Sequence, residues 1–259
     1  MCTLRGVELS DHVDAQRWYH TLELPGGVVT PGEYDLRAVA ERLPWPDLRG
    51  LRCLDVGGRD GFYAFAMEQR GAAEVISIDL ADPAGIDFPG PRPPDDAIQA
   101  ELDAGNAAFA LAREALGSAV QRRHVSVYDL RETDVGRFDF AVLGTLLLHL
   151  RNPVGALTAV RGVSGRLLVN DAVRPGRERR PLARFAPTPH EPFWWLLNRP
   201  ALLRAVEAAG WEIEQAGDPY PVPWGPGREA PSLLGGGLRQ LPQRAQMRRG
   251  APHVWVLAR

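Results

Sequence analysis

The sequence predicts an α/β fold built on a mostly parallel β-sheet. Short apolar runs recur along the chain, and segments with helical spacing of apolar residues separate them. Strands that alternate with helices form parallel sheets with right-handed crossovers. The last two predicted strands, 211–216 and 253–258, have no obvious helix between them, which favours an antiparallel edge pair. We therefore expect seven strands, of which the last is antiparallel.

Each predicted element has its own signal. The apolar run 51–56 closes on Gly57 and Gly58, which is typical of a buried strand. Asp95 and Asp96 suit the first turn of a long helix, because acidic side chains favour the positive end of the helix dipole. In chain order the sequence predicts strand 51–56, helix 61–70, strand 74–78, an irregular loop 82–94, helix 95–116, strands 124–128 and 138–143, helix 153–163, strand 166–170, helix 200–209, and strands 211–216 and 253–258.

The first 49 residues are expected to form a small N-terminal cap or substrate lid, followed by one domain over residues 50–259. Apolar residues in this segment, such as Trp18 and Leu22, are irregularly spaced, and Pro–Gly pairs interrupt the chain. A short helix is expected at 34–43.

The composition is that of an ordinary globular chain and argues against several classes of protein. The 259 residues carry a net charge of −2, so no whole-chain attraction to nucleic acid is expected. All 30 basic residues are Arg, which excludes any role for a Lys amine. Cys2, Cys53 and the scattered His residues give no disulfide framework and no metal-binding spacing. With no signal-peptide core at 1–10, and with 141–148 as the longest apolar run, a cytoplasmic protein without membrane contact is expected.

A glycine-rich turn after the first predicted strand is the strongest local signal. Residues 54–62 read LDVGGRDGF, so a strand runs into a turn that opens a helix. In dinucleotide-binding proteins such a turn holds a pyrophosphate. Here Asp55 precedes the first glycine, where a carboxylate would repel a pyrophosphate but accept hydrogen bonds from an ammonium group. S-adenosylmethionine (SAM) carries an ammonium and a sulfonium and no phosphate, so the turn favours SAM over NAD.

Acidic residues after the next two strands extend this site. Asp79 ends the second predicted strand, where an acid typically holds ribose hydroxyls, and Asp129 follows the third, where it can accept from the adenine amino group. Each acid also has an alternative role without a ligand. Asp55 could cap the helix, Asp79 could be a solvated loop acid, and Asp129 could be a turn acid. The predicted cofactor residues are Asp55, Gly57, Gly58, Asp60, Gly61, Phe62, Asp79, Leu80, Tyr128, Asp129 and Gly144, with Leu80 and Tyr128 flanking the adenine ring.

Three stretches of the chain match known sequence patterns. LDVGGRDG at 54–61 matches a "LDVGCGSGY"-like cofactor loop, GTLLLHLRNP at 144–153 resembles "GVLYHLRDP" with one extra residue, and FWWL at 193–196 with AGW at 209–211 resembles "yfipS…L…aGF". In these stretches the chain resembles class I SAM-dependent methyltransferases, and more specifically the group that includes the bacterial tRNA wobble-uridine enzyme that transfers a carboxymethyl group. The resemblance covers roughly residues 50–216 and implies a Rossmann-like, doubly wound fold that binds SAM.

Two departures from that group bear on the cofactor and the acceptor. The carboxylated cofactor of the tRNA enzyme is held by Lys and Tyr side chains, whereas this chain has no Lys and has Leu148 in place of the Tyr. A buried carboxylate without a partner is costly, so plain SAM is expected. The 50 residues before the cofactor loop also leave little room for that enzyme's added N-terminal domain.

Methyl transfer from a sulfonium is an in-line displacement that needs a base only if the acceptor carries a proton. His149 follows the fourth predicted strand and is the first candidate for a base or an acceptor-orienting group, and His190 and His20 are further candidates. A packing role is the alternative for each of them. Two Arg-rich stretches are either solvated loops or a grip on an anionic substrate or RNA: Arg174, Arg177, Arg179, Arg180 and Arg184, and Arg239, Arg244, Arg248 and Arg249.

The function expected from the sequence is methyl transfer from SAM to an oxygen or nitrogen of a small-molecule acceptor. One alternative is an RNA (tRNA) methyltransferase that uses the Arg-rich stretches. The other is a SAM- or nucleotide-binding protein without catalysis. No resident metal is expected, and the oligomeric state stays open.

Overall fold

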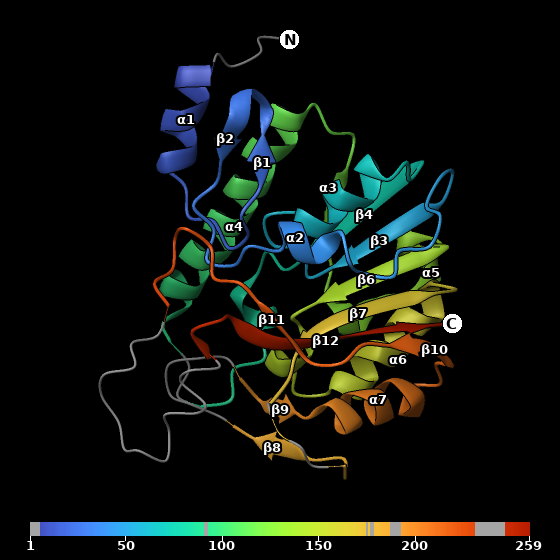
Figure 1. The fold of residues 1–259 in the computed structure, drawn as a ribbon. Helices are drawn as coiled ribbons and strands as arrows, with labels where there is room; N and C mark the ends of the chain where they lie inside the picture. Colours follow the sequence, from blue (N-terminus) through green and yellow to red (C-terminus); the bar gives the residue numbers. More distant parts are fainter. Residues whose placement is uncertain (1–5, 91–92, 175, 177–178, 187–192, 231–246) are drawn as a thin grey trace, which may run out of the picture.

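A mostly parallel sheet forms the centre of the protein (Figure 1). The computed structural model describes residues 6–90, 93–174, 176, 179–186, 193–230 and 247–259. The sheet has the strand order β5-β4-β3-β6-β7-β12-β10, with β11 paired to β12. β3 to β7 pair in parallel, whereas β12 is antiparallel to both β7 and β10. The strands are β3 (Arg52–Val56), β4 (Glu74–Asp79), β5 (Gln121–His124), β6 (Phe140–Gly144), β7 (Leu167–Ala172), β10 (Ile213–Ala216), β11 (Tyr220–Val222) and β12 (Ala251–Ala258).

This architecture confirms the predicted doubly wound α/β fold with an antiparallel last strand. The predicted antiparallel edge pair is also confirmed, because β10 and β12 pair antiparallel at one end of the sheet, with β10 outermost and β12 next to β7. The short strand β11 was not predicted, because its central Pro221 is unusual in a strand and faces Pro252 of β12.

The third strand lies earlier in the chain than predicted. It was expected at 124–128, but β5 ends at His124, and residues 127–129 form a 3₁₀ turn. The Ser126 hydroxyl accepts the Tyr128 N–H and turns the chain there. The short helix expected at 34–43 is limited to α2 (Arg37–Ala40), because the Tyr34 N–H bonds back to Tyr19.

Helices cover both faces of the sheet, and the alternation of strand side chains explains how (Figure 1). On β3, Leu54 and Val56 pack in one hydrophobic cluster with α6 (Pro153–Val163) and α7 (Arg199–Ala208). Cys53 points to the opposite face, in a second cluster with α3 (Phe62–Gln69) and α4 (Asp95–Leu116). The helices predicted at 95–116 and 153–163 have the observed bounds. A one-turn helix, α5 (Glu132–Val135), precedes β6.

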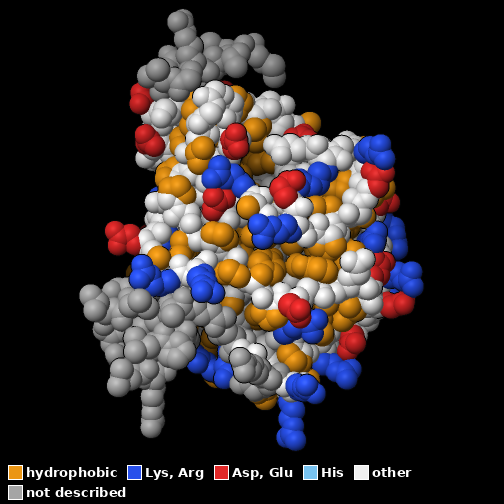
Figure 2. All heavy atoms as spheres, viewed as in Figure 1, with side chains coloured by type: hydrophobic (Ala, Val, Ile, Leu, Met, Phe, Trp, Pro, Cys, Tyr) orange, Lys and Arg blue, Asp and Glu red, His pale blue; other side chains and the backbone are white. Residues whose placement is uncertain are grey.

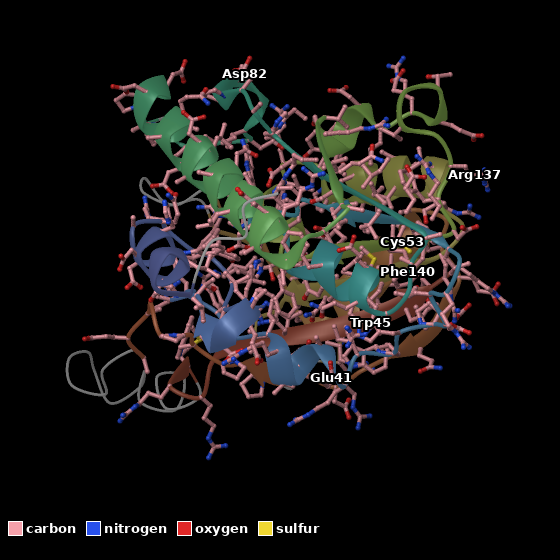
Figure 3. The ribbon with its side chains drawn as sticks, turned by 90° about the horizontal axis from the view of Figure 1, so that it is seen from above. Glu41, Trp45, Cys53, Asp82, Arg137 and Phe140 are labelled. Carbon is pink, nitrogen blue, oxygen red and sulfur yellow. The ribbon has the colours of Figure 1, made fainter. Side chains whose placement is uncertain are left out.

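The N-terminal residues pack on the second face. They form α1 (Gly6–Asp14), the hairpin of β1 (Glu23–Leu24) and β2 (Val28–Val29), and α2. Trp18 and Leu36 are buried in the same cluster as α3 and α4. The Trp45 ring lies 6.2 Å from the ring of Phe140, and Figure 3 shows Trp45 beside Phe140 and Cys53. The N-terminal residues therefore share a hydrophobic cluster with the helices on this face of the sheet.

None of the described helices is both long and apolar enough to cross a membrane. Within the described part of the chain, no three His, Cys, Asp or Glu side chains are grouped as a metal site would require.

Candidate functional site

The glycine-rich turn follows β3 at the carboxyl edge of the sheet and is held against β4. The N–H groups of Gly57 and Gly58 both donate to the carbonyl of Ile78, at 2.9 and 3.1 Å. A Cβ at position 58 would lie 2.0 Å from the Ser77 hydroxyl and 2.2 Å from Asp55 Oδ2. Glycine is therefore required at 58, because the turn passes directly over the Asp55 carboxylate.

Asp55 is a buried carboxylate with an unused hydrogen-bonding oxygen. Ser77 donates to its Oδ2 at 3.0 Å, and Oδ1 has no partner among the described residues. Burial raises the pKa of Asp55 to about 6, although the Arg122 guanidinium and the Ser77 hydroxyl oppose this shift. A buried acceptor without a donor is costly, so an ammonium group brought to this turn would find a matching partner.

Arg59 has a left-handed backbone, with a φ of 42°. Its N–H donates to Asp79 Oδ2 at 2.7 Å, and its carbonyl accepts from the Arg122 guanidinium. Arg122 is mostly buried, stacks 3.9 Å from the Phe109 ring centroid and pairs with Asp79 at 3.3 Å. These contacts clamp the turn from two neighbouring strands.

Sequence reasoning missed both arginines of this clamp. A signal for Arg59 was present, because the "LDVGCGSGY" pattern has glycine at that place. Arg122 gave no local signal, since it lies on the polar edge strand β5, far from the turn in sequence.

Asp79 ends β4, as predicted, with its side chain one-quarter exposed. Its Oδ1 accepts the Leu80 N–H at 2.8 Å and retains one further lone pair, whereas Oδ2 already accepts from Arg59 and Arg122. An acid in this position suits a hydroxyl of a ribose.

A narrow apolar cavity adjoins Asp79 at the ends of β4, β5 and β6. Its walls include Leu80, Tyr128, Leu146 and Leu150. Leu80 and Tyr128 thus line it together, as predicted for an adenine pocket. Asp129 does not line this cavity, because the 3₁₀ turn leaves its side chain exposed to solvent.

The Tyr128 ring is fixed by a polar hub that the sequence did not reveal. Its hydroxyl donates to Asp87 Oδ2 at 2.6 Å and accepts the Asn152 N–H at 3.0 Å. Asp87 also accepts the Arg151 N–H through Oδ2 and the Trp194 indole N–H through its backbone carbonyl. The hub joins the loop after β4 to the start of α6 and the approach to β9 (Trp195–Leu197).

The turn after β6 carries Gly144 and His149. Gly144 allows the Tyr63 ring to approach, since a Cβ there would lie 2.2 Å from it. The N–H groups of Leu146 and Leu147 donate to Asp171 Oδ2 at 2.9 and 2.8 Å. Burial raises the pKa of Asp171 to about 7, and these N–H groups oppose that rise.

His149 is half-buried, with its ring centroid 5.1 Å from that of Phe193. The structure therefore brings together the predicted histidine and the first residue of the aromatic FWWL stretch. Thr145, in the same turn, has a φ of 48° and lies 3.1 Å from the imidazole of His253. Burial lowers the pKa of His253 to about 4, so that ring is neutral. His190 lies outside the described residues.

Asp60, predicted to contact the cofactor, instead directs its carboxylate to the N-terminal segment. Oδ2 accepts the N–H groups of Tyr19 and His20 at 2.8 and 2.7 Å, and Oδ1 lies 2.5 Å from His20 Nδ1. Burial opposes ionisation, but the imidazole and the two N–H groups outweigh it and lower the pKa of Asp60. Phe62 packs against His20, with ring centroids 5.5 Å apart.

The described part of the first Arg-rich stretch lies around the hairpin of β8 (Ala183–Phe185) and β9. Figure 2 shows basic side chains around this hairpin and α7. Arg179, Arg180 and Arg184 are exposed there, as are Arg248 and Arg249 before β12. Arg177, Arg239 and Arg244 lie outside the described residues.

A family model described as a methyltransferase domain matches residues 32–216. The chain belongs to this methyltransferase family. The match spans β3 to β10 and so includes the glycine turn, Asp79, the apolar cavity and His149. A search of the curated proteins gives no match.

Solved structures share the fold of this SAM-dependent methyltransferase at low identity. The N-terminal domain of EvdMO1, crystallised in the presence of S-adenosylhomocysteine (SAH) and D-fucose, is 16% identical, with a TM-score of 0.58 over 100% of this chain and 99% of that one. The Burkholderia thailandensis 1,6-didemethyltoxoflavin-N1-methyltransferase, with bound 1,6-didemethyltoxoflavin and SAH, is 17% identical, with a TM-score of 0.54 over 86% and 77%. The [4+2]-cyclase SpnF is 19% identical, with a TM-score of 0.52 over 86% and 78%.

Proposed function

We propose that this methyltransferase transfers the methyl group of SAM to an oxygen or nitrogen of a small-molecule acceptor. The observation that carries the proposal is the arrangement at three adjacent strand ends. Asp55 offers an unpaired oxygen under the glycine turn, Asp79 offers a spare acceptor position on Oδ1, and the Leu80–Tyr128 cavity is apolar. These are the partners that the ammonium, ribose and adenine of SAM require.

When bound, SAM supplies an electrophilic methyl group, and the protein's part is to align it with the acceptor. Asp55 would hold the ammonium, Asp79 a ribose hydroxyl, and Leu80 and Tyr128 the adenine. Leu148 is buried where the carboxymethyl-transfer group has its Tyr, and the chain has no Lys. Both features favour SAM over its carboxylated analogue.

The acceptor is assigned to small molecules for two reasons. Two structures with the same fold were crystallised with a heterocycle or in the presence of a sugar. The chain as a whole carries a net charge of −2, which gives no general attraction to RNA. His149 and Phe193 lie beyond β6, where they would form part of the acceptor wall.

Calorimetry with SAM tests the cofactor site. Asp79→Ala should lower SAM affinity by about tenfold or more, because a charge-assisted hydrogen bond to the ribose is lost. Asp47→Ala, which removes an exposed carboxylate paired with Arg49, is the matched control and should bind SAM normally. Equal affinity in wild type and Asp79→Ala would refute the site.

Transfer of a labelled methyl group from SAM to small molecules of a cell extract tests the activity. Incorporation only into RNA, with a steep dependence on salt, would support the tRNA alternative instead. SAM binding without any incorporation would support a binding protein without catalysis.

A further inference from the structure

The N-terminal segment carries a histidine that docks on the cofactor turn. Asp60 lies between Arg59 and Gly61 in that turn and accepts three hydrogen bonds from Tyr19 and His20. The side chain of His20 is 9% exposed and that of Asp60 is 1% exposed. Tyr19 and His20 precede the region matched by the family model, residues 32–216. The contact with Asp60 therefore places an imidazole from outside that region beside the glycine-rich turn.

The pairing defines which imidazole nitrogen is basic. A carboxylate accepts a hydrogen bond from Nδ1–H of His20, so the neutral ring keeps its lone pair on Nε2. The same carboxylate orients the ring and stabilises the imidazolium that forms when Nε2 takes a proton. Three donors hold Asp60 in its ionised form, as this role requires.

The imidazole lies beside the part of the turn expected to hold the methionine half of SAM. Its ring contacts Phe62 and Tyr63 in the first turn of α3, at centroid distances of 5.5 and 6.3 Å. It is also close enough to Asp55 to oppose the rise in that group's pKa. The titratable groups around the imidazole are Asp60, Asp55, Tyr63 and Tyr19.

We propose that His20 and Asp60 form the general base of the methyl transfer, and that the acceptor group is therefore a hydroxyl. This inference rests on the proposed function. His20 Nε2 takes the hydroxyl proton while the acceptor oxygen bonds to the methyl carbon and the carbon–sulfur bond breaks with its electron pair on sulfur. Asp60 stays ionised and balances the imidazolium. A neutral amine can attack through its lone pair and lose its proton afterwards, whereas a hydroxyl is a weak nucleophile until its proton is removed, which is why a buried His–Asp pair points to a hydroxyl.

His20→Gln is the most informative variant, because its amide N–H can still donate to Asp60 while the basic nitrogen is lost. We expect methyl incorporation from labelled SAM into small molecules of a cell extract to fall by about 100-fold or more, the usual scale for a lost general base. SAM affinity and melting temperature should stay close to those of wild type. His12→Gln on α1, an exposed histidine, is the matched control and should retain full incorporation.

Asp60→Asn provides a second, independent measurement. Without the carboxylate nothing fixes the Nδ1–H tautomer or balances the imidazolium, so methyl incorporation should fall while SAM affinity stays close to that of wild type. A merely structural contact would lower the melting temperature and leave the incorporation rate of the folded protein unchanged.

The possible outcomes separate the two proposals. No incorporation by wild type contradicts the proposed function itself. Full incorporation by a folded His20→Gln protein contradicts the His20–Asp60 base alone. A loss of SAM affinity that matches the loss of rate would make His20 a cofactor ligand and overturn the base. Methyl groups found by mass spectrometry on nitrogen only would overturn the hydroxyl assignment.

Discussion

Asp55→Asn should change stability and cofactor binding in opposite directions. The carboxyl is buried, receives one hydrogen bond from Ser77 and has an unpaired Oδ1. Its pKa is raised from 3.8 to about 6 by burial, with Arg122 and Ser77 opposing. A difference of that size corresponds to about 3 kcal/mol for ionising the group in the folded protein.

The sign follows from comparing the folded and unfolded chains. Below about pH 4 the Asp55 carboxyl is protonated in both states and costs nothing. Between about pH 4 and pH 6 it ionises only in the unfolded chain, so stability falls as the pH rises. Above about pH 6 the full cost of about 3 kcal/mol is present. Asn at this position does not ionise. The free energy of unfolding of the variant, relative to that of wild type, should therefore rise by about 3 kcal/mol between pH 4 and pH 8.

In SAM binding, wild type should exceed the Asn variant, which is the opposite of their order in stability. Its ammonium prefers the ionised carboxylate, so wild-type affinity should rise from about pH 5 to pH 7. The Asn variant should bind SAM at least about tenfold more weakly, with little pH dependence in that range. Urea unfolding without SAM and calorimetry with SAM measure the two effects, and Asp47→Asn is the surface control. The reasoning fails if the stability difference is the same at both pH values, or if the variant binds SAM like wild type.

Three further outcomes are expected. Arg59→Gly should have a free energy of unfolding in urea that is about 1 kcal/mol or more above that of Arg59→Val, because glycine adopts the left-handed backbone without strain. Both variants keep the two backbone hydrogen bonds of residue 59. His149→Ala should raise KM for the acceptor more than it lowers kcat, if the ring orients the acceptor beside Phe193; an unchanged KM would remove it from the acceptor wall. In competition binding SAM should displace its carboxylated analogue, and the reverse order would contradict the role given to Leu148.

The elements predicted well from sequence are those with local start and stop signals. α4 begins with two acids after Pro94 and ends at Gly117, which adopts a left-handed C-cap. α6 begins with Pro153 after Asn152, whose side chain accepts the Gly155 N–H. β5 was misplaced because its residues are polar, and it is defined by pairing with the distant β4. No local pattern reports such a pairing.

The same distinction applies to the site. The places of Asp55, Asp79 and the glycines at neighbouring strand ends could be predicted, because each follows from a short local pattern. The pairing of Asp60 with His20 joins residues 40 positions apart, and the hub between Asp87 and Tyr128 joins residues 41 apart. Asp60 was consequently assigned to the cofactor, since its neighbours in sequence face that way.

In the glycine-rich turn, the Asp79 carboxylate holds the backbone conformation and is also proposed to bind SAM. Residue 59 takes a backbone conformation that ordinarily selects glycine, and Arg59 holds it because its N–H bonds to Asp79 and its carbonyl to Arg122. Asp79 is also the proposed ribose ligand. Its loss would free the Arg59 N–H as well as the ribose hydroxyl, so the turn would loosen over Asp55. Asp79→Ala should therefore lower SAM affinity by more than the loss of the ribose hydrogen bond alone. In the Asp79→Ala background, Asp55→Asn should also lower SAM affinity by less than it does in wild type.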